Sequence, residues 1–417
     1  MTNLKKSYIW NTLGSGFNSF NSLFYMVIVT RINGVKDAGI FTLSFATASM
    51  LYVIATYSGR TYQVTETEKD IDDNEFVFHR LMASFLMILI SIAFGLINGY
   101  QSYKFIVFIL LCLVKCVEAI CDVYHGILQK NDRLDVVGKS LFTRSILDVV
   151  CFLIVDKLTN NLIFSCLSLI IVDLVVLMFI DIKKSLKYKR KGKVNYQAVF
   201  KIFTLGFFTF GISFIANYLV NAPRYAIDSF MSPEFQTIFG IIVMPASVIM
   251  LVNQFIIQPV ILLLKNSYNK RDKSAFLKLI YKIIGLTCLT GIGSIILAYF
   301  LGMPVLKIMY GLDLKEYLYD LLIVLAGATL YTIASVLSNG LIILRKTKVQ
   351  LYIYIITSIL AFILSSKLVK LFNFNGAIYS YLIIMVTLLI LYIIYFIYIM
   401  NNKNIWKKEG VKNERKN

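Results

Sequence analysis

Apolar runs of roughly 20 residues recur along the whole chain, and they constrain its fold more than any other feature. A helix of about 20 apolar residues matches the ~30 Å hydrocarbon core of a bilayer. The chain of 417 residues is 58% hydrophobic, whereas soluble globular domains are roughly 45–50% apolar. The pattern therefore predicts an all-α integral membrane protein.

Twelve apolar windows lie between breaks rich in charged or turn residues, and we expect each to form a transmembrane helix. The first is too long for the core of a cleavable signal peptide, so we expect it to be retained. The predicted helices are 8–32, 37–59, 79–99, 104–129, 136–156, 161–182, 198–230, 235–264, 276–301, 316–343, 349–369 and 375–400.

The net charge of +19 is typical of nucleic-acid binding, but the distribution of basic residues favours a membrane. They gather in short loops between apolar runs, where they meet anionic lipid headgroups. With a cytoplasmic N-terminus, the loops on that side carry 31 of the 42 Lys and Arg residues and the opposite side carries nine. This bias predicts that both termini are cytoplasmic, and no nucleic-acid partner is expected.

The longest basic loop divides the twelve predicted helices into two sets of six. Weak similarity between "LGSGFNSF" at 13 and "LGFFTFGI" at 205 favours a parallel repeat of the two halves. The predicted organisation is an N-terminal six-helix bundle at 1–182, a basic cytoplasmic linker at 183–197, a C-terminal bundle at 198–400 and a basic cytoplasmic tail at 401–417.

Polar residues spaced by three and four positions mark one face of several predicted helices. A charge that faces lipid at the bilayer centre costs about 2.5–3.5 kcal/mol on insertion scales. These faces therefore predict a shared, water-filled cavity. The stripes comprise Asn217, Asn221, Arg224 and Asp228; Lys115, Glu118, Asp122, His125 and Gln129; Asn11, Ser15, Asn18, Ser22 and Tyr25; and Thr332, Ser335 and Asn339.

Each buried charge also has a purely structural interpretation. Lys115 lies about 16 Å from the start of its run at 1.5 Å per residue, and an internal ion pair with Glu118 is the alternative to ligand binding. Asp148 and Asp173 are equally compatible with plain interhelical hydrogen bonds. Arg144 is close enough to a helix end to reach the headgroups.

Motifs of soluble enzymes are missing from the sequence. It has no Walker A loop, HExxH or GxSxG element and no convincing GxGxxG. The six cysteines lie inside apolar runs and form no CxxC pair, so neither zinc nor disulfides are expected. We predict a protein that is not an enzyme and has no cofactor, with energy supplied by ion or substrate gradients.

Several stretches resemble polysaccharide-transporter-type oligosaccharide flippases. They are "NAPRYAID" with the following "MSPEFQTIFGIIVMPASVIMLVNQFIIQPVILLLKNSYNKRDKSAFLKLIYKI", and, in the first half, "DAGIFTLSFATASM", "YSGRTYQVTETEKD" and "EAICDVYHGILQKNDRLDVVGKSLFTRSIL". This family belongs to a superfamily with the multidrug and toxin extrusion transporters and the lipid II flippases. The lipid II branch typically carries two further helices that this chain lacks.

The resemblance implies two six-helix bundles around a central cavity, working by alternating access in a bacterial cell membrane. The implied cargo is a polyprenyl-diphosphate-linked oligosaccharide repeat unit, moved from the inner to the outer leaflet for capsule, O-antigen or exopolysaccharide assembly. Membrane lipids and a polysaccharide polymerase with its chain-length machinery are the other expected partners. The alternatives are a drug/cation antiporter of the same superfamily and a membrane polysaccharide polymerase.

An anionic diphosphate needs cationic and hydrogen-bonding donors away from bulk water. The predicted substrate-binding residues are Arg224, beside the helix-kinking Pro223, together with Asn217, Asn221, Lys115, Arg31 and Asn18. The buried acids of the first half outnumber the cations near them, and desolvation disfavours the charged form of a carboxylate. These predicted ion-coupling residues, which would take up H⁺ or Na⁺, are Glu118, Asp122, Asp148 and Asp173.

Overall fold

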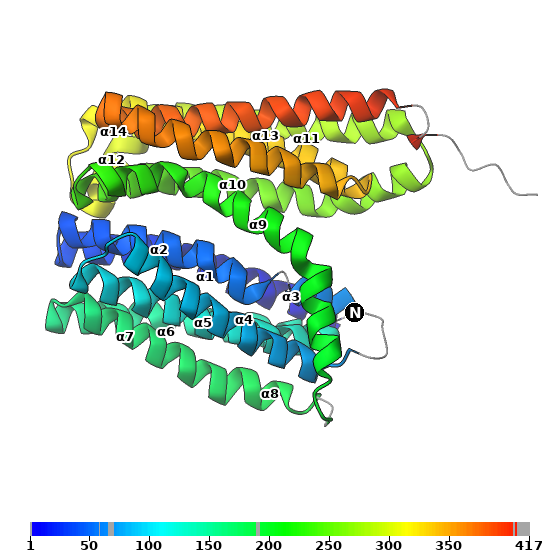
Figure 1. Cartoon of the computed structure of the whole chain (residues 1–417), viewed down its shortest axis with the longest axis horizontal. Coiled ribbons are helices and arrows are strands. Elements are labelled where there is room, and N and C mark those ends of the chain that lie inside the picture. Colours follow the sequence, from blue (N-terminus) through cyan, green and yellow to red (C-terminus); the bar gives the residue numbers. More distant parts are fainter. Residues whose placement is uncertain (1, 58, 66–70, 189–191, 403–404, 407–417) are drawn as a thin grey trace, which may run out of the picture. The chain divides into compact units, whose positions relative to one another are not determined.

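The computed structural model describes residues 2–57, 59–65, 71–188, 192–402 and 405–406. Every regular element within these ranges is helical, and the helices of each unit run side by side in Figure 1. The elements are α1 (Thr2–Ile32), α2 (Val35–Thr56), α3 (Gly59–Thr65), α4 (Asp73–Ile97), α5 (Ser102–Lys130), α6 (Leu134–Thr159), α7 (Leu162–Val176), η1 (Leu177–Ile182), α8 (Lys183–Ser185), α9 (Tyr196–Phe230), α10 (Pro233–Asn269), α11 (Lys273–Leu297), η2 (Ala298–Gly302), α12 (Met303–Tyr310), η3 (Lys315–Tyr317), α13 (Leu318–Ile343) and α14 (Thr347–Asn401).

Each predicted span corresponds to a long helical stretch, but the details differ at three places. The short helix α3 was not predicted. The ninth span continues beyond residue 301 through η2 into α12. The last two predicted helices are continuous as α14, which is broken at Asn373 by a non-helical backbone (φ 51°, ψ −131°). A Cβ on Gly376 would lie 2.0 Å from the carbonyl oxygen of Leu368, so the chain turns back on itself here.

Eight helical stretches of the described chain are long and apolar enough to cross a membrane. Helix α14 is one of them and contains two of the predicted spans. Helices α1, α5 and α6 are outside this set, because polar and charged side chains interrupt their apolar windows.

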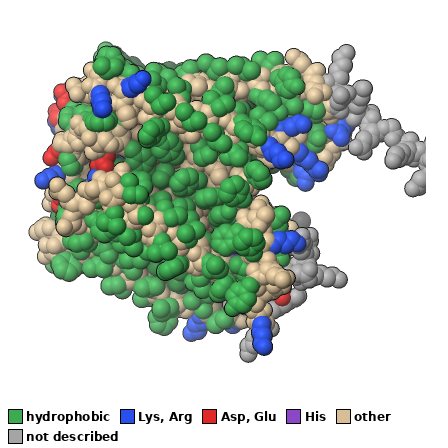
Figure 2. Space-filling model, in the orientation of Figure 1, with side chains coloured by type: hydrophobic (Ala, Val, Ile, Leu, Met, Phe, Trp, Pro, Cys, Tyr) green, Lys and Arg blue, Asp and Glu red, His purple; other side chains and the backbone are tan. Residues whose placement is uncertain are grey.

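The outward-facing side chains of the long helices are apolar. Phe85, Phe179, Phe200, Ile308 and Phe362 are each at least 66% exposed. Figure 2 shows hydrophobic side chains over most of the visible surface, with Lys and Arg near the helix ends. Apolar exposure on this scale is typical of surfaces that face lipid. The predicted all-α membrane fold is confirmed, and the protein is a multi-pass membrane protein.

The described chain forms two compact units. Unit 1 comprises residues 1–240 with 309–311, and unit 2 comprises 241–308 with 312–417. Helix α9, which the sequence assigned to the second bundle, packs against α2, α3 and α4 within unit 1. A functional division at the 183–197 linker stays a prediction.

Two glycines let α1 and α6 approach closely in unit 1. A Cβ on Gly138 would lie 2.2 Å from the backbone carbon of Trp10, and a Cβ on Gly14 would lie 2.1 Å from the carbonyl oxygen of Gly138. Small residues at such crossings are the usual basis of helix packing in membranes, where the hydrophobic effect contributes little between helices. This crossing positions the polar face of α1 beside α6.

Candidate functional site

Buried charges distinguish unit 1 from unit 2. In unit 2, Asp320 is the one buried residue of the Asp, Glu, Lys, Arg and His types within the described ranges. In unit 1 the buried set is much larger. It comprises Glu75, His79, Arg80, His125, Arg144, Asp148, Asp156, Asp173 and Asp181.

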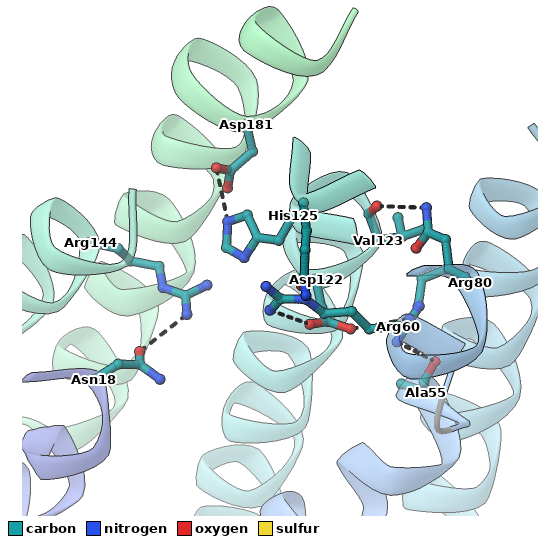
Figure 3. A network of polar contacts seen from close by, with 11 residues as sticks. Asn18, Ala55, Arg60, Arg80, Asp122, Val123, His125, Arg144 and Asp181 are labelled. Carbon is teal, nitrogen blue, oxygen red and sulfur yellow. Dashed lines mark hydrogen bonds and ion pairs between the residues drawn. The ribbon is translucent and has the colours of Figure 1, made fainter. Parts of the chain in front are cut away.

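Arg144 is the centre of a cluster that joins α1, α6 and α7. Its Nε lies 3.6 Å from Asp173 Oδ1, and the two side chains are 5% and 1% exposed. Arg144 Nη2 donates a hydrogen bond to Asn18 Oδ1 at 3.2 Å (Figure 3). Asp148 is buried one turn along α6, close enough for the charges of Asp173 and Arg144 to act on it. Asn18, Arg144, Asp148 and Asp173 are called the Arg144 cluster below.

The carboxylates of this cluster are not fully satisfied. Within the described residues, Asp148 Oδ1 and both oxygens of Asp173 accept no hydrogen bond. An orphaned buried acceptor is costly, because no water replaces the missing donor. The cluster therefore contains acceptor oxygens that a proton or a small cation would satisfy.

Lys115 and Glu118 form an ion pair within one turn of α5. Lys115 Nζ lies 2.9 Å from Glu118 Oε2 and 3.0 Å from Oε1. The same ammonium lies 4.7 Å from the ring centroid of Phe45 and 5.9 Å from that of Tyr52. Lys115 thus has both an anion and two aromatic faces as partners. This is the ion pair expected from the sequence as the alternative to ligand binding.

Asp122 has different cationic partners from the other predicted coupling acids. Its Oδ1 accepts a hydrogen bond from Arg60 Nη1 at 3.2 Å, and its Oδ2 lies 3.2 Å from Arg80 Nη2. Arg60 Nε also donates to Gln129 Oε1 at 3.1 Å, and Arg80 Nη1 donates to the carbonyl oxygen of Ala55 at 3.5 Å (Figure 3). These contacts fasten α3 and α4 to α5.

A fourth polar group in unit 1 contains His125. Its Nε2 lies 3.0 Å from Asp181 Oδ1, and Ser140 Oγ donates to the same oxygen at 2.5 Å. Asp181 belongs to η1, where the π-helical turn ends the α7 stretch. These contacts link α5, α6 and η1.

The predicted polar stripe of α9 consists of residues with distinct contacts. Asn217 Nδ2 donates to the carbonyl oxygen of Ser213 and Asn221 Nδ2 to that of Asn217, both at 2.9 Å. These bonds leave the amide oxygens pointing away from the backbone of their own helix. Asp228 forms an ion pair with Lys104, whose ammonium lies 3.9 Å from the ring centroid of Tyr100.

Arg224 lies where α9 and the start of α10 meet within unit 1. Pro223 lies inside α9 and lacks the N–H that would continue the helical hydrogen bonds. The guanidinium carbon of Arg224 is 5.3 Å from the ring centroid of Phe239, and its backbone carbonyl accepts a 2.5 Å bond from Gln236 Nε2. The other predicted arginine, Arg31, is at the end of α1, where its Nε donates to the carbonyl oxygen of Met309 at 2.7 Å.

Unit 2 contains a polar cavity of about 370 Å³ with no charged side chain in its lining. The amides of Gln254 and Gln258, one turn apart on α10, have no hydrogen-bond partner within the described chain. Asn253 is tied to α11, because its Oδ1 accepts a 2.6 Å bond from Thr287 Oγ1. The lining, called the amide cavity below, comprises Met250, Asn253, Gln254, Ile257, Gln258, Ile261, Tyr331, Thr332, Ser335 and Asn339.

The structure thus brings Asn18, Asp148 and Asp173 together around Arg144. It places Lys115 with Glu118, and Asp122 with Arg60 and Arg80. No contact in the described structure joins Arg224, Asn217, Asn221 or Arg31 to these clusters. Their assignment to substrate binding stays a prediction.

Sequence reasoning missed Arg80 and the two glutamines of the amide cavity. Asp72 and Glu75 form a capping box that starts α4 at Asp73, six residues before the predicted start. The D-x-x-E signature gives that start in the sequence and would have placed Arg80 two turns inside a helix. Gln254 and Gln258 are spaced by one helical turn, which is the signal for a shared polar face.

No protein-family model matches the chain. The capsular polysaccharide biosynthesis protein CapF of Staphylococcus aureus is 24% identical over 358 residues, which cover 84% of this chain and 89% of CapF. A multidrug resistance MATE family transporter of the MOP superfamily, solved in an inward-facing conformation, matches with a TM-score of 0.69 and 12% identity over 96% of both chains. The chain therefore has the fold of this MOP-superfamily transporter.

A second transporter structure is also similar to this chain in fold. The Vibrio cholerae MATE transporter VcmN, in its bent form, matches with a TM-score of 0.63 and 12% identity over 98% of this chain and 100% of VcmN. Because both matches cover nearly the whole chain, unit 1 and unit 2 are both included in the shared fold.

Proposed function

We propose that this protein is a MOP-superfamily flippase for a polyprenyl-diphosphate-linked oligosaccharide repeat unit. It moves that unit from the inner to the outer leaflet for assembly of a capsule or a related surface polysaccharide. The observation that carries the proposal is the sequence similarity to CapF, a capsular polysaccharide biosynthesis protein, on a chain with the MOP fold.

Cations within the helices support an anionic cargo. Arg224 is fixed beside a proline kink and over an aromatic ring, so its guanidinium loses little freedom when it binds a phosphate. Lys115 and Arg144 are two further cations inside unit 1, and we assign them to the negatively charged cargo as well. A cationic drug would meet repulsion from Arg224, which disfavours the drug/cation antiporter.

The amide cavity supports a cargo with many hydroxyl groups. A sugar hydroxyl both donates and accepts, and a glutamine amide offers two donors and an acceptor. Gln254 and Gln258 have these groups uncommitted within the described chain, and the cavity volume of about 370 Å³ lies within the ~300–1,000 Å³ of small-molecule sites. We assign the amide cavity to the oligosaccharide and the cations of unit 1 to the diphosphate.

Ion coupling is part of the proposal and is assigned to the Arg144 cluster. Asp148 and Asp173 share one guanidinium, and their orphaned oxygens are suited to a proton or Na⁺. Glu118 is already paired with Lys115, and Asp122 with two arginines. Transport into vesicles with an imposed pH or sodium gradient tests this. Asp173→Asn should abolish the response to the gradient, whereas Glu118→Gln should retain more of it; transport that ignores both gradients contradicts coupling.

The proposed location is the bacterial cytoplasmic membrane, with both termini in the cytoplasm. The support is the excess of Lys and Arg in alternate loops. A polysaccharide polymerase with its chain-length machinery would take the cargo in the outer leaflet. Labelling a cysteine placed at Lys187 tests the orientation. Reaction with an impermeant reagent in intact cells would show that this residue faces outward and that the proposed orientation is wrong.

The test of function is gene deletion in the native host, followed by complementation. Loss of the protein should stop surface polysaccharide export and leave the lipid-linked oligosaccharide in the inner leaflet. Arg224→Ala should fail to restore export at wild-type abundance, and Arg224→Lys should restore only part, since an ammonium lacks the bidentate fork. Unchanged surface polysaccharide together with sensitivity to cationic drugs would instead identify a drug antiporter.

A further inference from the structure

A cavity in unit 1 lies at the end of α5, α6 and α8, and it adjoins the His125–Asp181 contact through Ser140. Its volume is about 440 Å³. Its lining comprises Leu128, Arg133, Asp135, Val136, Lys139, Ser140, Thr143, Ile180, Lys184, Lys187 and Tyr188. It thus contains four cationic side chains and one carboxylate, together with the hydroxyls of Ser140, Thr143 and Tyr188.

The single carboxylate orients Arg133 and also lies near Lys139, which leaves Lys184 and Lys187 without an acidic partner within the described residues. Asp135 accepts from Arg133 Nε at 3.0 Å and from Nη2 at 3.4 Å. The remaining Nη1 donates to the hydroxyl of Tyr188 at 2.9 Å. Lys139, Lys184 and Lys187 form no ion pair within the described residues. Lys139 Nζ lies 5.4 Å from the ring centroid of Trp10. The cavity therefore has a fixed guanidinium and two ammonium groups, those of Lys184 and Lys187, without an acidic partner within the described residues.

Apolar side chains continue from the rim of this cavity along the outside of the helices. Met178, Phe179 and Leu186 are 58%, 66% and 58% exposed, and each lies within two residues of a lining residue in the sequence. A free phosphate ion would gain nothing from this surface, whereas the acyl chains of a lipid would cover it.

We propose that this cavity is a binding site for the phosphate headgroup of an anionic phospholipid, with the acyl chains along Met178, Phe179 and Leu186. The site is independent of the proposed transport function. Lys184 and Lys187 contact the phosphate oxygens, and the guanidinium of Arg133, which Asp135 and Tyr188 hold in place, adds a fixed positive charge beside them.

The bound lipid would also stabilise the neighbouring end of unit 1. Ser140 lines the cavity and donates to Asp181, which pairs with His125. A lipid that bridges Lys139 on α6 and Lys184 on α8 therefore adds a link beside the Ser140–Asp181 hydrogen bond, which joins α6 to η1 from inside. Occupancy should raise the melting temperature of the purified protein.

The test uses the full chain, purified in detergent, and native mass spectrometry with phosphatidylglycerol as the probe. One phosphatidylglycerol should be retained preferentially over phosphatidylcholine. Each basic residue near an anionic lipid contributes about a fivefold change in affinity, so Lys184→Gln/Lys187→Gln should weaken retention roughly 25-fold. Lys346→Gln/Lys348→Gln, which removes the same charge from the start of α14 in unit 2, should leave it unchanged.

Two results would overturn the proposal. One is equal phosphatidylglycerol retention by the wild type and Lys184→Gln/Lys187→Gln. The other is displacement of the lipid by millimolar inorganic phosphate, which would assign the cavity to a free anion. Because both lysines are exposed, the variant should fold, and unchanged circular dichroism and gel-filtration volume establish this. Neither readout depends on transport, so the flippase proposal can fail without affecting this one.

Discussion

Unit 1 and unit 2 are built from similar apolar helices but contain different polar interiors. Unit 1 holds the Arg144 cluster, the Lys115–Glu118 pair and the Asp122–Arg60–Arg80 contacts. Unit 2 holds the uncharged amide cavity. Its ion pair Lys307–Asp313 lies at the surface, with side chains that are 54% and 50% exposed.

The difference has an energetic consequence. Buried charges cost several kcal/mol each in desolvation, on the order of 2.5–3.5 kcal/mol at a bilayer centre, and are tolerated only when they are paired. Neutral amides cost less and do not need a specific counter-ion. Substitutions of buried residues in unit 1 should therefore lower the stability of the protein more than those in unit 2. Changes to the cavity of unit 2 should leave stability intact but reduce function.

The largest effect is expected for Arg144→Leu. This substitution leaves Asp148 and Asp173 buried without their guanidinium, and breaking a buried ion pair typically costs about 3–5 kcal/mol. Thermal unfolding in detergent should show the loss. Arg144→Leu/Asp173→Leu should recover part of it, because it removes the uncompensated charge as well. Wild-type stability for the single variant would contradict the role given to this cluster.

A smaller loss is expected for Gly138→Ala. The new Cβ would meet the backbone of Trp10, and overpacking of this kind typically costs about 1–3 kcal/mol. Gly285→Ala in α11 of unit 2 is the matched control, since no atom lies within 4 Å of its Cβ position. The control should be neutral or slightly stabilising, because alanine favours the helix. Equal destabilisation of both variants would show that the close α1–α6 contact is not the cause of the loss in stability.

Gln254→Leu/Gln258→Leu should change stability by less than about 0.5 kcal/mol, because neither amide has a hydrogen-bond partner within the described chain. The same variant should reduce polysaccharide export severalfold in the complemented deletion strain. Gln197→Leu, an exposed amide on α9, should leave export unchanged. Normal export by the double variant would show that the amide cavity does not bind the oligosaccharide.

The smallest effect is expected at Lys307–Asp313. The hydrogen bond from Lys307 lowers the pKa of Asp313, so any stabilisation is present at neutral pH and is lost as the pH falls through that lowered pKa. Since the pair is solvated, Lys307→Met should have the same melting temperature as the wild type at pH 7. A clear drop at pH 7 that disappears in acid would show that solvated pairs also matter here.

Much of the candidate site could be read from helical spacing, and some of it could not. The Lys115–Glu118 pair follows from an i,i+3 spacing within one helix. The pairing of Arg144 with Asp173 did not follow, because it joins α6 to α7 and depends on how those helices are rotated. Asp122 was grouped with the other acids by its helix face, whereas its partners Arg60 and Arg80 come from α3 and α4.

The sequence alone determined that the chain is an all-helical membrane protein and approximately where each helix lies. Apolar length and loop charge are local properties, and the bilayer acts on each segment separately. Tertiary structure decided which polar groups meet, such as Arg144 with Asp173 and His125 with Asp181, and it decided that the amides of α10 line one cavity with the hydroxyls of α13. Those meetings depend on helix rotation and on close contacts such as Gly138 against Trp10, and no single segment contains that information.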